Sequence, residues 1–115
     1  MKKTRDSIKY ALCGIKYVFE SQRNIRVQLI IMIITYITGY FFNISSTEWL
    51  TLILISSMVL TLEIINTALE EVVNLVTEEY RKTAKHAKDT AAGAVLTASF
   101  FAIVVGLIIF IPKIV

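Results

Sequence analysis

The fold of this chain is decided by one stretch near its middle, which reads Thr61-Leu-Glu-Ile-Ile-Asn-Thr-Ala-Leu-Glu-Glu-Val-Val-Asn74. It ends a long apolar run, which predicts a membrane-spanning helix. On such a helix Glu63, Asn66, Glu70 and Asn74 fall within an arc of about 80°, and we call them the polar stripe. Polar side chains at membrane depth are costly and usually mark a functional path. We therefore expect the stripe to be the centre of a functional site.

The composition is typical of a membrane protein. Of the 115 residues, 56% are hydrophobic, and the mean hydropathy is +0.67, which makes the chain more apolar than ordinary soluble domains. Three apolar segments predict transmembrane helices over residues 27–43, 48–76 and 89–111, with a polar loop over 77–88. Ser46 or Thr47 is expected to cap the second helix, with Glu48 favourable in its first turn.

Residues 1–25 combine apolar and basic positions. Ile8, Leu12, Ile15 and Phe19 fall on one face of a helix, with basic residues between them, which predicts an amphipathic helix. A basic polar face of this kind suits a membrane surface, although the apolar face can also pack on the bundle itself. The predicted fold class is therefore an all-α integral membrane protein, with an N-terminal surface helix and three transmembrane helices.

The basic residues are unevenly distributed. All but one of the 12 Lys and Arg residues lie in the N-terminal quarter or in the loop over 77–88. Beside membrane spans, this bias indicates cytoplasmic segments and contact with anionic lipid. It predicts a multi-pass protein of the cell membrane with its N-terminus in the cytoplasm. Nucleic acid, the other partner of a basic surface, is not expected.

The polar stripe, the basic loop and the pair Lys88-Asp89 are expected at one level, the cytoplasmic membrane face. Carboxylates can hold a divalent cation, basic side chains can hold phosphates, and a carboxylate can accept the proton of a lipid hydroxyl. A P-loop is absent from the sequence. From the residues alone, phosphoryl transfer stands beside two alternatives: a proton-coupled small transporter, and an ion pair that holds the bundle together.

Two motifs and their separation resemble the prokaryotic diacylglycerol kinase family. The first is Glu63-Ile-Ile-Asn-Thr-Ala-Leu-Glu-Glu-Val-Val73, and the second is Ala87-Lys-Asp-Thr-Ala-Ala-Gly-Ala-Val95, with Glu79-Tyr80 between them. The segment Arg23-Asn-Ile-Arg26 is most similar to the Gram-positive branch, whose members are typically undecaprenol kinases. The resemblance implies a homotrimer with active sites shared between subunits, MgATP as phosphoryl donor and a membrane lipid alcohol as acceptor.

The resemblance also implies roles for single residues. Glu63 is the implied general base and Asn66 its support, while Glu70 is the implied metal ligand that bridges to ATP. Further nucleotide contacts are implied for Tyr10, Glu79, Tyr80, Lys88 and Asp89. The lipid-access surface is implied around Asn24, Arg26 and Gln28, and Glu63 is the implied contact for the lipid hydroxyl.

Two positions depart from the family pattern. Gln22 stands where the family usually has a Glu that serves as second metal ligand, and Asn74 stands where it usually has Asp. A neutral amide can coordinate a metal through its oxygen but brings no charge. The expected function is phosphorylation of undecaprenol to undecaprenyl phosphate, with diacylglycerol conversion to phosphatidic acid as the alternative. A third alternative is a family member with impaired catalysis that keeps a binding or transport role.

Overall fold

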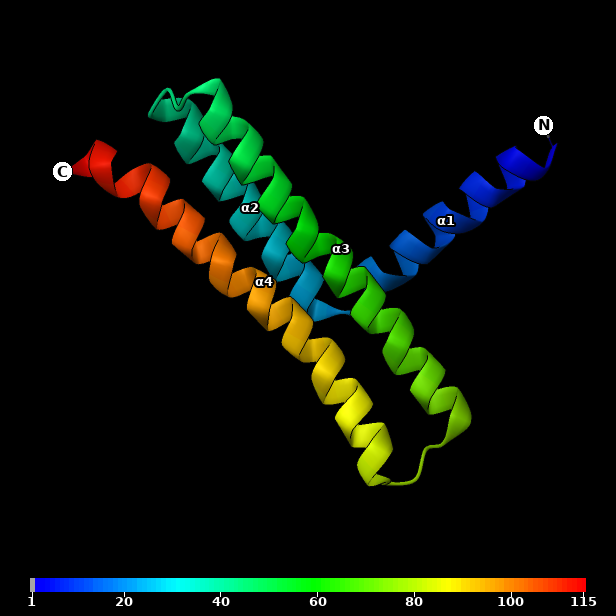
Figure 1. Ribbon diagram of the computed structural model, residues 1–115. Coiled ribbons are helices and arrows are strands. Elements are labelled where there is room, and N and C mark those ends of the chain that lie inside the picture. The colour runs from blue at the N-terminus through cyan, green and yellow to red at the C-terminus, as the bar shows by residue number, and fades with distance from the viewer. Residues whose placement is uncertain (1) are drawn as a thin grey trace.

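The computed structural model describes residues 2–115, which form four helices and no strand. These are α1 (Lys2–Ser21), α2 (Arg23–Phe41), α3 (Ser46–Val76) and α4 (Lys82–Ile114). In Figure 1, α2, α3 and α4 lie side by side, and α1 projects away from the middle of α3. Helices α2, α3 and α4 are long and apolar enough to cross a membrane, which confirms the prediction of three apolar spans. We call residues 42–45 the turn end of the bundle and residues 77–81 its loop end.

The projecting helix α1 ends at a break in the backbone. Gln22 is extended (φ −113°, ψ 115°) and separates α1 from α2, so the helix expected over residues 1–25 stops at Ser21. The guanidinium of Arg26 donates hydrogen bonds to the carbonyl oxygens of Phe19 (2.8 Å) and Glu20 (3.0 Å). These are carbonyls of the last turn of α1, which has no helical donor for them. Arg26 therefore caps α1 from the neighbouring helix.

The turn end is built by local hydrogen bonds. Asn43 adopts a left-handed conformation (φ 50°), which Asn tolerates better than most residues. Ser45 then caps α3, not Ser46 or Thr47 as expected. Its Oγ accepts from the backbone N–H of Glu48, and its own N–H donates to the Glu48 carboxylate. The expectation was wrong because this reciprocal pattern requires a Glu three residues after the cap, and only Ser45 has that spacing.

At the loop end, α4 begins at Lys82 and not at residue 89 as expected, which shortens the loop. Alanines and lysines dominate its first two turns, and both residue types have high helix propensity. Lys85 and Asp89, one turn apart, form an ion pair along the helix. A charged sequence is thus compatible with a helix that continues beyond the apolar span. At its far end α4 runs through Pro112 to Ile114, past the expected limit at residue 111.

A buried hydrophobic cluster lies at the turn end. Ile44, Leu52 and Ile109 form a buried cluster, against which Trp49 and Phe110 pack. A β-carbon on Gly39 would come within 2.9 Å of the Ile44 side chain, so only glycine fits without a shift. Lys113 and Glu48 form an ion pair of 3.2 Å that joins α4 to the start of α3. This end holds the three spans together, while the polar stripe lies towards the other end.

Candidate active site

Glu63, the first residue of the polar stripe, is almost completely buried, with 3% of its surface exposed. Its Oε2 accepts a hydrogen bond from Gln28 Nε2 on α2, at 3.4 Å. One turn further, Thr67 donates from Oγ1 to the Glu63 carbonyl oxygen (3.0 Å), so its own hydroxyl is satisfied within α3. Because a buried carboxylate is costly unless it is paired or functional, Glu63 is the strongest candidate for a reacting group.

Asn66 and Glu70 form the next step of the stripe. Asn66 is 8% exposed, and its Nδ2 donates to Glu70 Oε1 at 3.4 Å. Asn66 Oδ1 is buried and has no hydrogen-bond partner among the described residues. A buried acceptor without a donor is unfavourable, which makes this oxygen a candidate ligand atom. Together with the half-buried Glu70 carboxylate, it offers a small set of oxygen donors.

A groove of about 520 Å³ opens between α2, α3 and α4. Most of its walls are apolar, and its few polar groups include the hydroxyl pair Tyr36 and Ser56, which are hydrogen-bonded to each other. It extends along α2 from Gln28 to Thr38, which corresponds to roughly 15 Å of helix. Gln28 lines this groove and also contacts Glu63. One end of the groove therefore lies a single hydrogen bond from the buried carboxylate, which is not itself among the lining residues.

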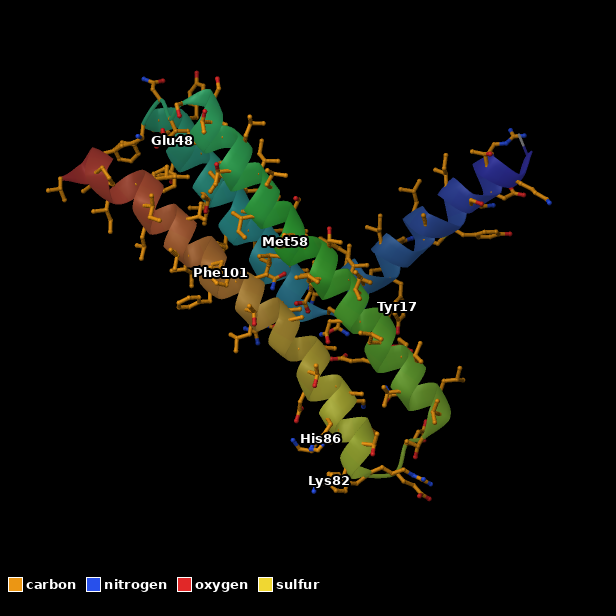
Figure 2. All side chains as sticks on the ribbon, in the orientation of Figure 1. Tyr17, Glu48, Met58, Lys82, His86 and Phe101 are labelled. Atoms are coloured by element: carbon orange, nitrogen blue, oxygen red, sulfur yellow. The ribbon has the colours of Figure 1, made fainter. Side chains whose placement is uncertain are left out.

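At the loop end, a charged cleft of about 390 Å³ lies between the last turns of α3 and the first turns of α4. Four residues expected to contact the nucleotide line it: Glu79, Tyr80, Lys88 and Asp89. Figure 2 shows this end of the molecule, with Lys82 and His86 labelled on α4. The structure therefore brings these four predicted residues to one place.

The last member of the stripe, Asn74, lies at the edge of this cleft. Lys88 Nζ donates a hydrogen bond of 2.6 Å to Asn74 Oδ1. The partner of the ammonium is thus a neutral amide, and among the described residues no carboxylate lies within ion-pair distance of it. A cation of this kind in a cleft is suited to bind a phosphate.

Other predicted residues lie apart from the two cavities. Tyr10 is on the projecting helix with 69% of its surface exposed, and it does not line the charged cleft. Asn24 and Arg26 are exposed and absent from the groove lining. Of the four predicted lipid-substrate residues, which also include Gln28 and Glu63, only Gln28 lines the groove. Gln22 occupies the break between α1 and α2. The roles implied for these residues remain predictions.

One contact was not expected from the sequence. Tyr17 on α1 donates a hydrogen bond of 2.7 Å to Glu71 on α3, and Figure 2 shows Tyr17 where α1 meets the bundle. The hydrogen bond to Glu71, reinforced by the negative charge of that carboxylate, raises the pKa of Tyr17 above its ordinary value. The two residues are far apart in the sequence, so periodicity carries no signal for their contact.

An ion pair that holds the bundle together is one alternative role for Glu63. Within residues 2–115, the side-chain partner of Glu63 is an amide, and no Lys or Arg lies within ion-pair distance of it. The ion pairs that do join or brace helices lie at the turn end and in the charged segments. Glu63 is therefore not held by a cation in the described part of this chain.

The structure combines three helices that could span a membrane, a buried carboxylate one hydrogen bond from an apolar groove, and a charged cleft at the loop end. Comparison with known proteins gives the family. The sequence model of prokaryotic diacylglycerol kinase matches residues 9–110. The chain belongs to the prokaryotic diacylglycerol kinase family, whose named members are lipid kinases, that is, phosphotransferases with an alcohol acceptor.

Two relatives show how far the similarity extends. A diacylglycerol kinase of Synechocystis sp. is 39% identical over 107 residues, which cover 92% of this chain and 61% of the relative. An undecaprenol kinase of Bacillus subtilis is 35% identical over 107 residues, which cover 93% of this chain and 87% of the relative. The chain thus spans less than two thirds of the length of the first relative and most of the second.

Proposed function

We propose that this chain is an ATP-dependent lipid kinase, with undecaprenol as the preferred acceptor and diacylglycerol as the alternative. The observation that carries the proposal is the position of Gln28, which lines the apolar groove and contacts the buried Glu63. A lipid chain in the groove has its hydroxyl end at this carboxylate. Such a site can bind an alcohol with a long apolar chain and activate its hydroxyl in the same place.

Glu63 is proposed as the general base. Its carboxylate accepts the proton of the lipid hydroxyl as the hydroxyl oxygen forms a bond to the γ-phosphorus of ATP. The bond between that phosphorus and the bridging oxygen of ADP breaks, and the electron pair leaves with ADP. The products are the lipid phosphate, ADP and a proton on Glu63, which is then released to water.

The charged cleft is proposed as the nucleotide site. Glu63 and Asn74 are eleven positions apart on α3, roughly 16 Å along the helix. A triphosphate that enters at the cleft beside Lys88 therefore lies along the polar stripe, with its terminal phosphate directed towards Glu63. Glu79, Tyr80 and Asp89 line the cleft and are proposed to contact the rest of the nucleotide. Tyr10 is kept as a further nucleotide contact from the family resemblance.

Magnesium is the cation that this chemistry usually employs. The residues fit it in part: the Glu70 carboxylate and the unpartnered Asn66 Oδ1 are both oxygen donors, as Mg²⁺ prefers. Among the described residues no three His, Cys, Asp or Glu side chains gather into a metal cluster. We propose that Glu70 and Asn66 hold a cation that comes with the phosphates of ATP, with Gln22 as a neutral further ligand. When bound, the cation neutralises charge on the phosphates.

Further features are proposed for the assembled protein. We place it in the plasma membrane, with its N-terminus and charged cleft in the cytoplasm, because the basic residues gather there. Helix α1 is proposed to lie on the membrane surface, since Ile8, Leu12, Ile15 and Phe19 are exposed along it. A homotrimer with shared active sites follows from the family resemblance. Asn24 and Arg26 are proposed as part of the lipid-access surface.

Undecaprenol is preferred over diacylglycerol for two reasons. The sequence around Arg23 and Asn24 resembles the Gram-positive branch, and the match to the Bacillus subtilis undecaprenol kinase covers most of that protein. The groove itself does not discriminate by charge, because its walls are largely apolar. A catalytically impaired binding or transport protein remains the alternative, because Gln22 and Asn74 bring no charge to the site.

The test is a reaction with defined components. The purified protein in detergent receives MgATP and either undecaprenol or diacylglycerol, and lipid phosphate is followed with time. We expect product from at least one lipid, with undecaprenol the faster, and none in a matched reaction without lipid. A folded preparation that phosphorylates neither lipid overturns the kinase proposal and favours the binding or transport alternative.

A further inference from the structure

Gln28 is one of two side chains on α2, with Tyr36, whose described hydrogen bonds reach α3. The hydroxyls of Thr35 and Thr38, which follow it on α2, donate to carbonyls of their own helix. Gln28 instead directs its amide across to α3, where Nε2 donates to Glu63 Oε2. Its polar group therefore serves another helix, which points to a role at Glu63.

The other polar atom of the Gln28 amide has no partner in the part of the chain that the structure describes. Its Oε1 is buried and has no hydrogen-bond partner among the described residues. An unpaired buried oxygen is unfavourable, and an apolar side chain of similar size would remove the penalty. The contact with Glu63 is thus the one described hydrogen bond that this amide makes. An apolar residue here would remove one unpaired buried oxygen, but it would also leave the buried Glu63 carboxylate without this donor.

The direction of this hydrogen bond is fixed by chemistry. An ionised carboxylate can only accept hydrogen bonds, so the NH₂ group of Gln28 must face it. The bond occupies Glu63 Oε2, while no hydrogen bond to Glu63 Oε1 occurs among the described residues. A hydrogen bond to one oxygen restrains the orientation of the carboxylate and leaves the other oxygen without a described partner.

We propose that Gln28 is a positioning residue: its amide N–H holds Oε2 of Glu63 so that Oε1 faces the head of the lipid in the groove. This inference rests on the proposed kinase function and assigns Gln28 a task beyond lipid contact. Because Gln28 also lines the groove, the same side chain contacts the lipid and orients the base. The proton passes from the lipid hydroxyl to Glu63 and never to Gln28.

Turnover of variants tests this role. Gln28→Leu keeps the approximate size of the side chain and removes the donor. We expect kcat to fall about a hundredfold, the usual cost of a base misplaced by about 1 Å, with the KM values for ATP and lipid changed less than about twofold. Gln28→His, which keeps an N–H donor, should recover part of kcat. Thr97→Val is the matched control, because its hydroxyl bonds only to Gly93 of its own helix, and it should resemble the wild type.

Each other outcome has a definite meaning. A wild-type kcat in Gln28→Leu overturns the proposal. A raised lipid KM with an unchanged kcat also overturns it, because Gln28 would then be a lipid contact only. If the wild-type protein turns over neither lipid, the proposed kinase function has failed. If the wild type is active and Gln28→Leu is equally active, only the positioning role has failed.

A second measurement does not depend on activity. The chain has only two glutamines, Gln22 and Gln28, so a Gln22→Asn protein has a single glutamine amide to label with ¹⁵N. Solid-state NMR in bilayers can then measure dipolar coupling from this nitrogen to ¹³C-labelled glutamate carboxyl carbons. We expect one dipolar coupling between the Gln28 side-chain nitrogen and a glutamate carboxyl carbon. This coupling should disappear in Glu63→Ala. No such coupling in the folded protein overturns the proposal whether or not the protein is an enzyme.

Discussion

Tyr17 on α1 donates a hydrogen bond of 2.7 Å to Glu71 on α3, and this contact fixes the projecting helix against the bundle. Glu71 is adjacent to Glu70 of the polar stripe, so the position of α1 is linked to the helix that carries the site. Arg26 adds a second restraint, because it caps the last turn of α1 from α2. The angle between α1 and the spans is therefore set by side chains on both neighbouring helices.

Alkaline pH is expected to release α1. The pKa of Tyr17 is raised in the folded protein by its hydrogen bond to Glu71, whereas an unfolded Tyr titrates near about 10. The stabilisation is therefore complete below that pH and is lost as the pH rises through the folded-state pKa, since a phenolate cannot donate and is repelled by Glu71. A spin label on Cys13 and a second on an introduced Leu75→Cys can report the distance between α1 and α3 by pulsed EPR.

The control for this experiment is Tyr17→Phe, which lacks the hydroxyl. Its distance distribution should already be broad at neutral pH and should not change up to pH values at which the wild type broadens. A narrow, wild-type distribution in Tyr17→Phe would show that the hydrogen bond does not hold α1.

Gln22→Glu is expected to tighten the binding of Mg²⁺. The added carboxylate supplies a charge that Gln22 lacks, and even water-screened unit charges at contact interact by about 1 kcal/mol. Because the cation carries two charges, the gain is about 2 kcal/mol, and the Mg²⁺ concentration for half-maximal turnover should fall roughly thirtyfold. Glu20→Gln, at an exposed position paired with Lys16, is the comparison and should change the requirement little. An unchanged Mg²⁺ requirement in Gln22→Glu would place Gln22 away from the metal.

Lys88→Met is expected to weaken ATP binding. The Lys88 ammonium bonds to the neutral Asn74 amide, so its charge is available to a phosphate. Loss of a hydrogen bond to a charged group costs about 1.5–3 kcal/mol, which raises the Kd for ATP about tenfold to a hundredfold. Isothermal titration with a non-hydrolysable ATP analogue measures the effect. Lys82→Met, at the start of α4 and outside the lining of the charged cleft, is the matched control; equal affinities for the two variants would argue against the proposed role of Lys88.

Gly39→Ala is expected to destabilise the turn end. The new β-carbon would lie 2.9 Å from Ile44 Cδ1 and 3.2 Å from the Trp49 ring. Forced repacking of this kind typically costs about 1–3 kcal/mol, so the midpoint of thermal unfolding in detergent, followed by circular dichroism, should fall. Gly93→Ala, where nothing lies within 4 Å of the added atom, should not lower it. If both variants unfold like the wild type, the packing described around Gly39 is wrong.

The sequence predicted the apolar helices and the position of the polar stripe because hydrophobic periodicity acts locally. It also indicated that Glu63 and Asn66 face the interior, since polar groups at membrane depth avoid lipid. Element ends were less predictable: Ser45 was missed as a cap because the adjacent Ser46 and Thr47 are equally good by residue type. The charged start of α4 has the polarity of a loop, whereas its alanines and lysines favour a helix, and the structure follows the helix propensity.

Long-range partners were beyond sequence reasoning. The contacts of Gln28 with Glu63 and of Tyr17 with Glu71 join residues 35 and 54 positions apart. A lone glutamine in an apolar span indicates a functional position, but its partner depends on how the helices pack. The structure supplies these partners for the two ends of the polar stripe. Its first member, Glu63, has a partner on α2, and its last member, Asn74, bonds to Lys88.

The central claim is that Glu63 is the base that activates the lipid hydroxyl, and Glu63→Gln tests it most directly. The amide keeps the size of the side chain but cannot accept a proton. With the preferred lipid and MgATP, we expect lipid phosphate formation to fall at least about a hundredfold, in line with loss of general base catalysis, while the Kd for an ATP analogue stays within about twofold of the wild type. Wild-type turnover in Glu63→Gln would contradict the assignment of Glu63 as the base.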